Sequence, residues 1–459
     1  MPRTIAVIGG GAAGVIVSAH LLRAASASRP VSVLLVDPAE TPGRGLPYRT
    51  TDPRHTLNAV VARLSAFDDD PEHLLRWCAA AGVPAEPGTF LQRADFGRYL
   101  TELLPSVPAP DGSSVRHVRG TVVDAEDLAG GADGAAAADG GDGPGVVLTL
   151  ADGGTLRADA AVLALGMPPP VPLPEYEPWG ERYVADPWSP DLDARAAGAR
   201  RVLVVGTGLT TLDVVAHLHP LLPGARFTAV SRGGVLPAAH AADLLPPAVE
   251  VELDGELTLA GALDVVRNRA DAERAARRDW RAVIDAVRPQ VNPAWARLTQ
   301  EERATFQREH SRSWENVRHR MSHAMRTHID ELIAAGVLTV GTVAEVRGGA
   351  QWDTGAFDLV VGATGLPPLT SPGWNPVVDA LLARGLIRPH GLGTGLDLTP
   401  EAALVDAAGV AHPRLRAMGL ARRGLEWECT SVPDLRRQAA ALADDLLGAQ
   451  LGAPASASA

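Results

Sequence analysis

Lysine is missing from the sequence altogether. All 42 basic side chains among the 459 residues are arginine. This excludes chemistry that needs a primary amine: a Walker A phosphate loop, a Schiff base to pyridoxal phosphate, and a lysine general base. We attribute the absence to genomic base composition rather than to mechanism.

Cysteine is nearly as scarce. The two residues, Cys78 and Cys429, are far apart and form no CxxC pair, which argues against a disulfide framework and against a dithiol redox centre. A net charge of −12 gives no overall attraction to nucleic acid or to anionic lipid. Near the N-terminus there is no signal-peptide pattern and no run of about 20 apolar residues. We therefore expect a cytoplasmic protein with no membrane or nucleic-acid partner.

The composition is that of a globular protein, with 46% apolar and 21% charged residues. The length predicts two or three domains, at about 150 residues each. Strand-like apolar runs alternate with helical patterns, which predicts an α/β fold with mostly parallel sheets. A strand–glycine–helix pattern occurs twice, once from Thr4 and again from Arg201.

The first glycine-rich segment, GGGAAG, lies directly between a strand-like run and a helical run. Its spacing is that of a dinucleotide fingerprint: Gly9 makes the turn, Gly11 lets backbone N–H groups approach a pyrophosphate, and Gly14 lets helix and strand pack closely. Asp37 closes the next strand, where a carboxylate accepts hydrogen bonds from an adenosine ribose. The alternative is a glycine-rich turn in an unrelated α/β fold.

The second segment, GTGLTT, repeats this geometry with Gly206 and Gly208 and places Thr211 where the third glycine would stand. The strand that follows ends in Ser231 and Arg232 instead of an acid. A guanidinium pairs with a 2′-phosphate, whereas a carboxylate would repel it. We therefore expect this site to bind NADPH. The alternative is an arginine that only extends into solvent.

Two unlike dinucleotide sites in one chain imply FAD and NADPH, with a hydride passing between them. The first site takes FAD, because an acid tolerates an unphosphorylated ribose. Asn58 is a candidate to hydrogen-bond the flavin, with a turn-forming asparagine as the alternative. We expect two Rossmann-like domains: an FAD-binding domain over residues 1–195, an NADPH-binding domain with a helical insertion over 196–345, and a return to the FAD domain with a C-terminal helix over 346–459.

Nine segments carry a family resemblance along nearly the full chain: IAVIGGGAAG, GRGLPY, HTLNA, FLQRADFGRYL, VADPW, VVGTGLTTLDVV, SRGGVLP, WENVRHRM and RGLEWECTSVPDLR. In them the chain resembles the two-dinucleotide-fold flavoproteins. Within these it is most similar to the FAD/NAD(P)-binding group that contains flavin-dependent urate hydroxylases and nitrosuccinate-forming L-aspartate N-monooxygenases. Two positions depart from related patterns. Val184 stands where Baeyer–Villiger enzymes carry a histidine, and Leu420 stands where an acid is often found near the flavin.

The resemblance implies a flavin monooxygenase that forms a C4a-(hydro)peroxyflavin from FAD, NADPH and O2, and keeps water away from it. It implies N-oxygenation of a small amino acid, with L-aspartate to nitrosuccinate as the best single guess, in specialised metabolism such as antibiotic biosynthesis. Ring hydroxylation of a urate-like purine, Baeyer–Villiger insertion and a non-oxygenating flavin redox sensor remain alternatives. No catalytic side chain is identified, and the oligomeric state is left open.

The substrate-binding candidates come from two arginine-rich segments: Arg318, His319 and Arg320 in WENVRHRM, and Arg423 in ARRGLEWE. An acidic substrate needs arginines on its carboxylates. The alternatives are a solvated helix face for the first segment and a structural contact for Arg423. His319 and His323 have the i,i+4 spacing of a zinc pair, but no carboxylate motif accompanies them, so we expect no metal.

Local signals predict several smaller features. Thr299 with Glu302 predicts a capping box, and Gly336 predicts a helix end. Asp70 predicts the start of a helix, and Arg93 is expected to cap a helix or form a salt bridge. The insert LAGGADGAAAADGGDGPG, which has almost no large side chain, predicts a mobile surface loop.

Overall fold

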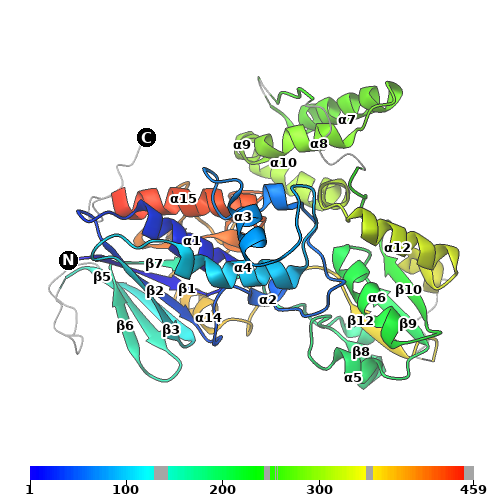
Figure 1. The fold of residues 1–459 in the computed structure, drawn as a ribbon, viewed down its shortest axis with the longest axis horizontal. Helices are drawn as coiled ribbons and strands as arrows, with labels where there is room; N and C mark the ends of the chain where they lie inside the picture. The colour runs from blue at the N-terminus through cyan, green and yellow to red at the C-terminus, as the bar shows by residue number, and fades with distance from the viewer. Residues whose placement is uncertain (129–142, 242–248, 254, 256, 348–354, 449–459) are drawn as a thin grey trace.

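The computed structural model describes residues 1–128, 143–241, 249–253, 255, 257–347 and 355–448. Most of the glycine- and alanine-rich insert predicted as a loop lies outside these residues. Two parallel sheets stand side by side, and a group of helices lies above them (Figure 1). None of the described helices combines the length and the apolar character needed to cross a bilayer.

The first sheet has six strands in the order β13-β14-β7-β1-β2-β3. All neighbours are parallel except β13 and β14. The strands are β1 Arg3–Ile8, β2 Val31–Asp37, β3 Ser114–Arg119, β7 Ala160–Leu163, β13 Ala403–Val405 and β14 Ala411–Ala417. The helices of this unit are α1 Ala12–Ala24, α2 Gly45–Tyr48, α3 His73–Ala80, α4 Arg93–Ser106, α14 Pro376–Ala383 and α15 Val432–Gly448. A small antiparallel sheet is attached to it, built from β4 Val122–Leu128, β5 Gly145–Leu150 and β6 Thr155–Ala158.

The second sheet lies between β7 and β13 in the chain. Its five parallel strands run in the order β11-β10-β9-β12-β8. They are β8 Tyr183–Val184, β9 Arg201–Val205, β10 Arg226–Ser231, β11 Leu338–Thr342 and β12 Leu359–Gly362, with helices α5 Leu192–Ala196, α6 Leu209–Leu221 and α13 Val343–Arg347. The chain thus leaves the first sheet, builds the second and returns. This confirms the predicted α/β fold with one dinucleotide unit inserted in the other, while the limits at residues 195 and 345 stay predictions.

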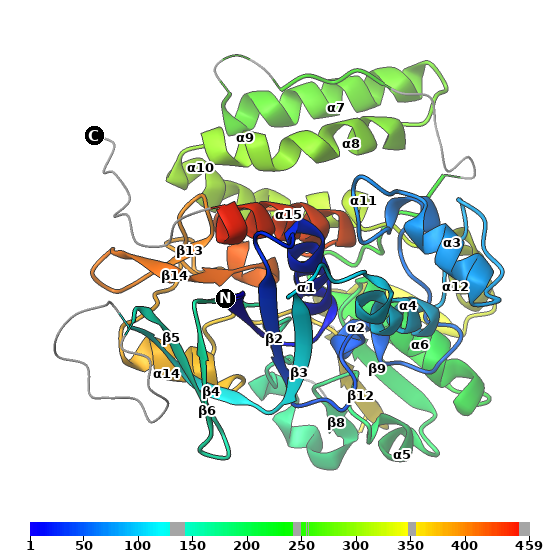
Figure 2. The same ribbon diagram turned by 60° about the vertical axis from the view of Figure 1, so that its left-hand side comes forward.

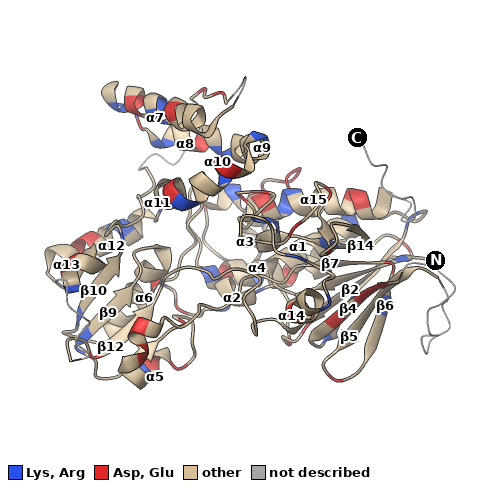
Figure 3. Ribbon diagram, turned by 180° about the vertical axis from the view of Figure 1, so that it is seen from behind, with Lys and Arg blue, Asp and Glu red and all other residues tan. Residues whose placement is uncertain are grey.

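A helical insertion connects β10 to β11, as the sequence predicts. It contains α7 Leu259–Ala275, α8 Arg281–Val287, α9 Val291–Arg297, α10 Gln300–Thr305, α11 Ser311–Arg318 and α12 His323–Ala334. Charged residues of both signs are interspersed along α7 and α11 (Figure 3). Beneath this charged surface the insertion has its own buried apolar cluster, in which Val283 and Val287 of α8 pack with Ala270 of α7.

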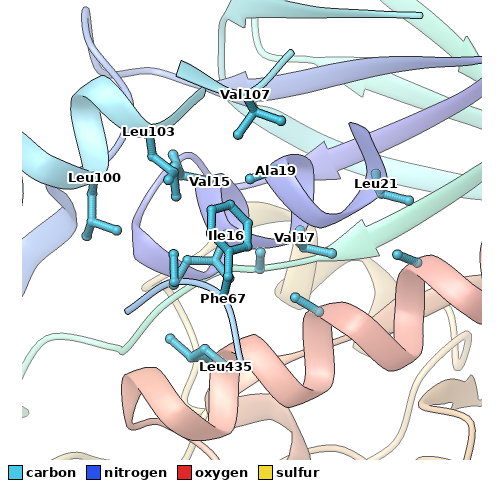
Figure 4. Packing of buried hydrophobic residues seen from close by; sticks show 14 of the residues in the cluster. Val15, Ile16, Val17, Ala19, Leu21, Phe67, Leu100, Leu103, Val107 and Leu435 are labelled. Atoms are coloured by element: carbon cyan, nitrogen blue, oxygen red, sulfur yellow. The ribbon is translucent and has the colours of Figure 1, made fainter. Parts of the chain in front are cut away.

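The core of the first unit depends on both ends of the chain. Helix α15 lies against α1 (Figure 2). Leu435 from α15 belongs to the same buried cluster as Val15 and Ile16 from α1 and Phe67 from the loop before α3 (Figure 4). The glycine loop that opens α1 is therefore held by packing against the last described helix.

Local predictions fare unevenly. The capping box at Thr299 and Glu302 is present, and Gly336 follows the last turn of α12 with a φ of 67°. Both predictions are confirmed. The predicted helix start at Asp70 is wrong: α3 begins at His73, with Glu72 as its N-cap. The Asp70 carboxylate accepts a hydrogen bond from Arg76 and does not cap the helix, although the Asp70 carbonyl accepts hydrogen bonds from the His73 amide and the Ser65 hydroxyl.

Candidate functional site

The first dinucleotide loop joins β1 to α1. Gly9 has a φ of 105°, and a Cβ there would stand 2.5 Å from the carbonyl oxygen of Ala164. A Cβ on Gly14 would stand 1.8 Å from the carbonyl oxygen of Gly9, so both positions require glycine. Gly11 is the N-cap of α1, and neither a side-chain cap nor an acidic residue occupies that first turn. Its amides are therefore available to an anion such as a pyrophosphate.

Asp37 stands beside this loop at the end of β2. Its carboxylate accepts hydrogen bonds from the amides of Gly10, at 2.6 Å, and Ala39, at 2.8 Å. The contact with Gly10 places the acid at the loop that would hold the pyrophosphate. That arrangement suits a dinucleotide whose ribose lies next to its phosphates.

The second loop joins β9 to α6 and has the same shape. Gly206 has a φ of 139°, and a Cβ there would stand 2.1 Å from the carbonyl oxygen of Ala363. Gly208 is the N-cap of α6, again with no side-chain cap and no acid in the first turn. Thr211 lies in the first turn of that helix, fully buried.

The strand after the second loop ends at Ser231 and Arg232. The Ser231 hydroxyl lies 2.8 Å from the Thr207 hydroxyl and accepts a hydrogen bond from the Gly234 amide. It therefore shapes the turn. Arg232 is exposed beside it, so its guanidinium is open to a phosphate at the edge of the loop.

A small pocket, referred to below as the arginine cavity, lies where the first unit meets the helical insertion. Four arginines and one carboxylate line it, together with a histidine and an asparagine: Arg63, Arg288, Arg318, Arg320, Asp285, His240 and Asn58. The structure therefore brings together three of the predicted residues, Asn58, Arg318 and Arg320. The excess of positive charge makes this cavity suited to an anion.

Two of these arginines lack full pairing. Arg288 donates to the Ser431 hydroxyl at 3.0 Å and, among the described residues, has no carboxylate within ion-pair distance. Burial and the neighbouring Arg318 lower the pKa of Arg288 to about 10. Arg318 Nη2 forms an ion pair with the Glu428 carboxylate at 3.2 Å, and Arg318 Nε is buried without a hydrogen-bond partner. Both guanidinium groups have capacity for a ligand.

The other two arginines share the single carboxylate. Arg320 is 3% exposed and forms an ion pair with Asp285. Arg63 approaches the second oxygen of Asp285 at 3.5 Å. Asp285 thus compensates one charge of four and leaves the cavity cationic.

His319 and Arg423 lie elsewhere, although the sequence grouped them with Arg318. Both bind Glu315: His319 Nδ1 forms an ion pair with it, and Arg423 Nη2 donates at 2.9 Å. Burial opposes the charge of Glu315, but these two partners outweigh it and hold the pKa of its carboxyl at about 2. Arg423 also stacks on Trp427, 3.8 Å from the ring centre. Neither residue lines the cavity, so their predicted substrate contact stays a prediction.

A second small pocket lies next to the start of α6. It is lined by Asn58 and, among others, by Leu209 and Asp213 of α6. Arg93 reaches this place and pairs with Asp213 at 2.6 Å, which confirms the salt-bridge alternative for that arginine. Asn58 is common to both cavities and stands between the second dinucleotide loop and the arginine cluster.

Four cavity residues escaped the sequence analysis: Arg63, His240, Asp285 and Arg288. None belongs to a short motif, and they come from segments far apart in the chain. His240 and Asn58, for example, are 182 positions apart and 2.9 Å from Nε2 to carbonyl oxygen. The only available signal was that His240 follows SRGGVLP, one of the segments that carry the resemblance.

Among the described residues, one group has the spacing of a metal site, formed by Asp52, His55 and His217. His217 Nδ1 lies 2.6 Å from Asp52, and its Nε2 lies 2.6 Å from Asp193. Arg54 occupies both oxygens of Asp52. The ion pairs therefore already use the atoms that a metal would need.

Comparison with known proteins shows what parts of the chain are similar to. Residues 6–168 match the sequence family described as FAD-NAD(P)-binding. The L-aspartate N-monooxygenase (nitrosuccinate-forming) of Streptomyces cremeus is 32% identical over 258 residues, which cover 46% of this chain and 37% of that protein. The matched part of this chain thus spans little more than a third of the relative's length.

Solved structures agree over the whole chain. The Kutzneria sp. 744 ornithine N-hydroxylase has a TM-score of 0.60 at 14% identity, with 97% of this chain and 99% of that chain covered. The L-lysine 6-monooxygenase of Pseudomonas syringae has a TM-score of 0.60 at 15% identity, with 97% and 98% covered. The reduced ornithine hydroxylase of Pseudomonas aeruginosa has a TM-score of 0.58 at 14% identity, with 97% and 98% covered. The chain therefore shares the fold of these three structures, and its residues 6–168 match the FAD-NAD(P)-binding family.

Proposed function

We propose that the chain is an FAD- and NADPH-dependent monooxygenase that N-oxygenates a small acidic amino acid, with conversion of L-aspartate to nitrosuccinate as the best candidate. The cationic cavity beside Asn58, in a fold shared with flavin N-monooxygenases, carries this proposal. The Streptomyces cremeus relative supports the choice of L-aspartate by its name. The Kutzneria structure supports the cofactors, since it holds reduced FAD, NADP+ and L-ornithine.

The first loop fits FAD and the second fits NADPH. The uncapped amides at Gly11 receive the FAD pyrophosphate, and Asp37 receives the ribose hydroxyls. The amides at Gly208 receive the NADPH pyrophosphate, and Arg232 pairs with the 2′-phosphate. When bound, the reduced flavin supplies the electrons that activate O2.

The arginine cavity binds the acidic substrate. Arg288 and Arg318 each have an incompletely paired guanidinium, and two carboxylates of one dicarboxylic amino acid match two such groups. Arg320 is held by Asp285 and acts as a fixed positive charge. A cationic, partly dry cavity also lowers the pKa of the substrate ammonium, which favours the neutral amine that N-oxygenation requires.

Oxygen-isotope labelling tests the proposal. Purified protein receives NADPH, labelled O2 and one of four compounds: L-aspartate, L-ornithine, urate or a cyclic ketone. We expect L-aspartate to stimulate NADPH consumption and to gain labelled oxygen on nitrogen. Label on carbon of urate or in a lactone contradicts the proposal, and so does NADPH consumption that no compound stimulates.

Two substitutions localise the substrate. Arg288→Met and Arg318→Met each leave a bound carboxylate unpaired, which costs about 2 kcal/mol, or roughly 30-fold in KM for L-aspartate. Flavin content and the rate of flavin reduction by NADPH stay at wild-type values. Arg267→Met, on an exposed part of α7 and paired only with Asp264 in the described chain, is the matched control and leaves KM unchanged.

A further inference from the structure

His240 lies at the wall of the arginine cavity and is half-buried. Its Nε2 lies 2.9 Å from the carbonyl oxygen of Asn58. A carbonyl oxygen can only accept a hydrogen bond, so Nε2 carries the ring proton in this contact. In a neutral imidazole that leaves Nδ1 as a proton acceptor.

No hydrogen-bond partner stands at Nδ1 within the described part of the chain. The groups that surround His240 come from four elements, and only one of them is an acid. They are Arg63 after the Asn58 loop, Asp285 from α8, Arg288 after α8, and Arg318 and Arg320 at the end of α11. Asp285 is already paired with Arg320 and Arg63, whereas no arginine among the described residues is bonded to Nδ1.

Resting on the function proposed above, we infer that His240 Nδ1 accepts a proton from the ammonium group of the bound amino acid. The carboxylates of the substrate are held by Arg288 and Arg318, and the amine is left to face the remaining acceptor. His240 is therefore a catalytic residue in contact with the substrate, carried by the second dinucleotide unit and oriented by Asn58 of the first.

The proton balance agrees with this role. The N–H bond of R–NH3+ breaks, its electron pair stays on nitrogen, and the proton forms a bond to Nδ1. The freed lone pair forms the N–O bond while the O–O bond breaks, and the second oxygen atom leaves as water. The change in this first oxygenation is R–NH3+ + O2 + NADPH → R–NHOH + NADP+ + H2O, with O2 as oxidant and NADPH as reductant. The proton that His240 takes up is thus the one that the water product consumes.

The charges around His240 set its protonation state. Burial lowers the pKa of His240 to about 4, with Arg320 and Arg63 acting in the same direction. The ring is therefore neutral at neutral pH before substrate arrives, and the same shift opposes proton uptake until the surrounding charge changes. Substrate carboxylates cancel part of the surrounding positive charge, which raises the basicity of Nδ1 when the ammonium is present.

His240→Gln tests the inference. A glutamine amide retains a donor for the Asn58 carbonyl and has no proton acceptor of comparable basicity. His323→Gln is the matched control, because His323 also contacts a backbone carbonyl through Nε2, that of Ala241, but does not line the cavity. Both variants are compared with the wild type for flavin content, for flavin reduction by NADPH and for formation of N-oxygenated L-aspartate. Product formation is measured from a pH of about 6.5 to about 9, a range that spans the ordinary pKa values of histidine and of an amino group.

We expect His240→Gln to reduce flavin at the wild-type rate and to lose about 10²-fold in product formation near pH 7. The ratio of wild-type to variant product formation should fall about tenfold for each unit that the pH rises, because more of the substrate is then free amine. A purely structural role would not produce that recovery. His323→Gln should follow the wild type throughout.

A His240→Gln variant with product formation within twofold of wild type and the same pH profile overturns the inference and leaves the proposed function standing. A wild-type protein that forms no N-oxygenated L-aspartate overturns both. Histidine 15N NMR provides a readout that needs no variant and no turnover. The Nδ1 signal of His240 should move from an unprotonated toward a protonated position when L-aspartate is added without NADPH, and an unmoved signal at saturation overturns the inference.

Discussion

In the first dinucleotide loop the third fingerprint position is Gly14, and in the second loop it is Thr211. A Cβ on Gly14 would stand 1.8 Å from the Gly9 carbonyl oxygen, whereas Thr211 has a full side chain that is buried without clash. The first positions behave alike, since Gly9 and Gly206 both have positive φ and both face a carbonyl just after the neighbouring strand of the sheet, β7 or β12. The glycine that makes the turn is thus required in both loops, whereas a glycine at the third position is required only in the first.

The largest effect is expected from copying the second loop into the first. Gly14→Thr places a side chain on the Gly9 carbonyl, which α1 can relieve only by moving off its strand. We expect a loss of about 3 kcal/mol or more in the free energy of unfolding, together with loss of bound flavin, measured by denaturant unfolding and by absorbance. The reciprocal Thr211→Gly should cost about 1 kcal/mol. Equal effects of the two substitutions would break the comparison.

The two loops are followed by different residues, Asp37 after the first and Arg232 after the second, and we expect Arg232 to make the second site prefer NADPH over NADH. Arg232→Ala should raise KM for NADPH about tenfold or more, because one charge-assisted contact to the 2′-phosphate is lost, and should leave KM for NADH nearly unchanged. Arg226→Ala, at the other end of β10 and bonded to the Gly336 carbonyl, is the control. Similar losses with both nucleotides would refute the 2′-phosphate role.

The helix after the second loop also holds the first unit, through His217. Burial opposes protonation of this ring, but its contacts with Asp52 and Asp193 prevail and raise the pKa of His217. The charged ring therefore stabilises the fold fully below pH of about 6.5, and the contribution is lost as pH rises through the raised value. We expect about 1 kcal/mol or less, since the ring is partly exposed.

Unfolding measured from pH 5.5 to 8.5, a span of about three units around the histidine value, should show this decline in the wild type. His217→Gln should reduce it, and the part that remains is expected from His412, whose pKa is raised by its hydrogen bond with Asp127. His219→Gln, on the same helix, should preserve it, because burial lowers the pKa of His219 instead. A decline that is undiminished in His217→Gln assigns the effect to another group.

The smallest effect is expected at the threonine itself. The Thr211 hydroxyl is buried without a hydrogen-bond partner, so Thr211→Val replaces a costly polar atom with a methyl group of similar size. We expect stability between unchanged and about 1 kcal/mol higher. A loss beyond that in denaturant unfolding would mean that the hydroxyl has a role in the loop.

The features that could be predicted from the sequence depend on interactions between residues close together in the chain. The two loops, the Thr299 capping box and the Gly336 helix end each depend on residues within a few positions, so their patterns are visible in the sequence. The return to the first sheet follows from the second fingerprint interrupting the first. The grouping of Arg318 with His319 was less informative, since neighbours on α11 point to different partners, Glu428 and Glu315.

The rest depended on contacts between distant segments. Arg288 and Arg318 meet in one cavity because the insertion folds back, and Asn58 meets His240 because two units pack together. No periodicity or motif encodes such distances. Arginine is also the only basic residue in the chain, so its residue type does not separate binding positions from ordinary surface charge.

The packing of α15 on α1 has a consequence for how the protein is made. Leu435 and Leu442 complete the core around Val15 and Ile16, more than four hundred positions earlier in synthesis. The segment that contains α1 therefore leaves the ribosome long before its packing partner, and during that interval its apolar surface is open to chaperones. Closure of this core during translation would mark the synthesis of α15.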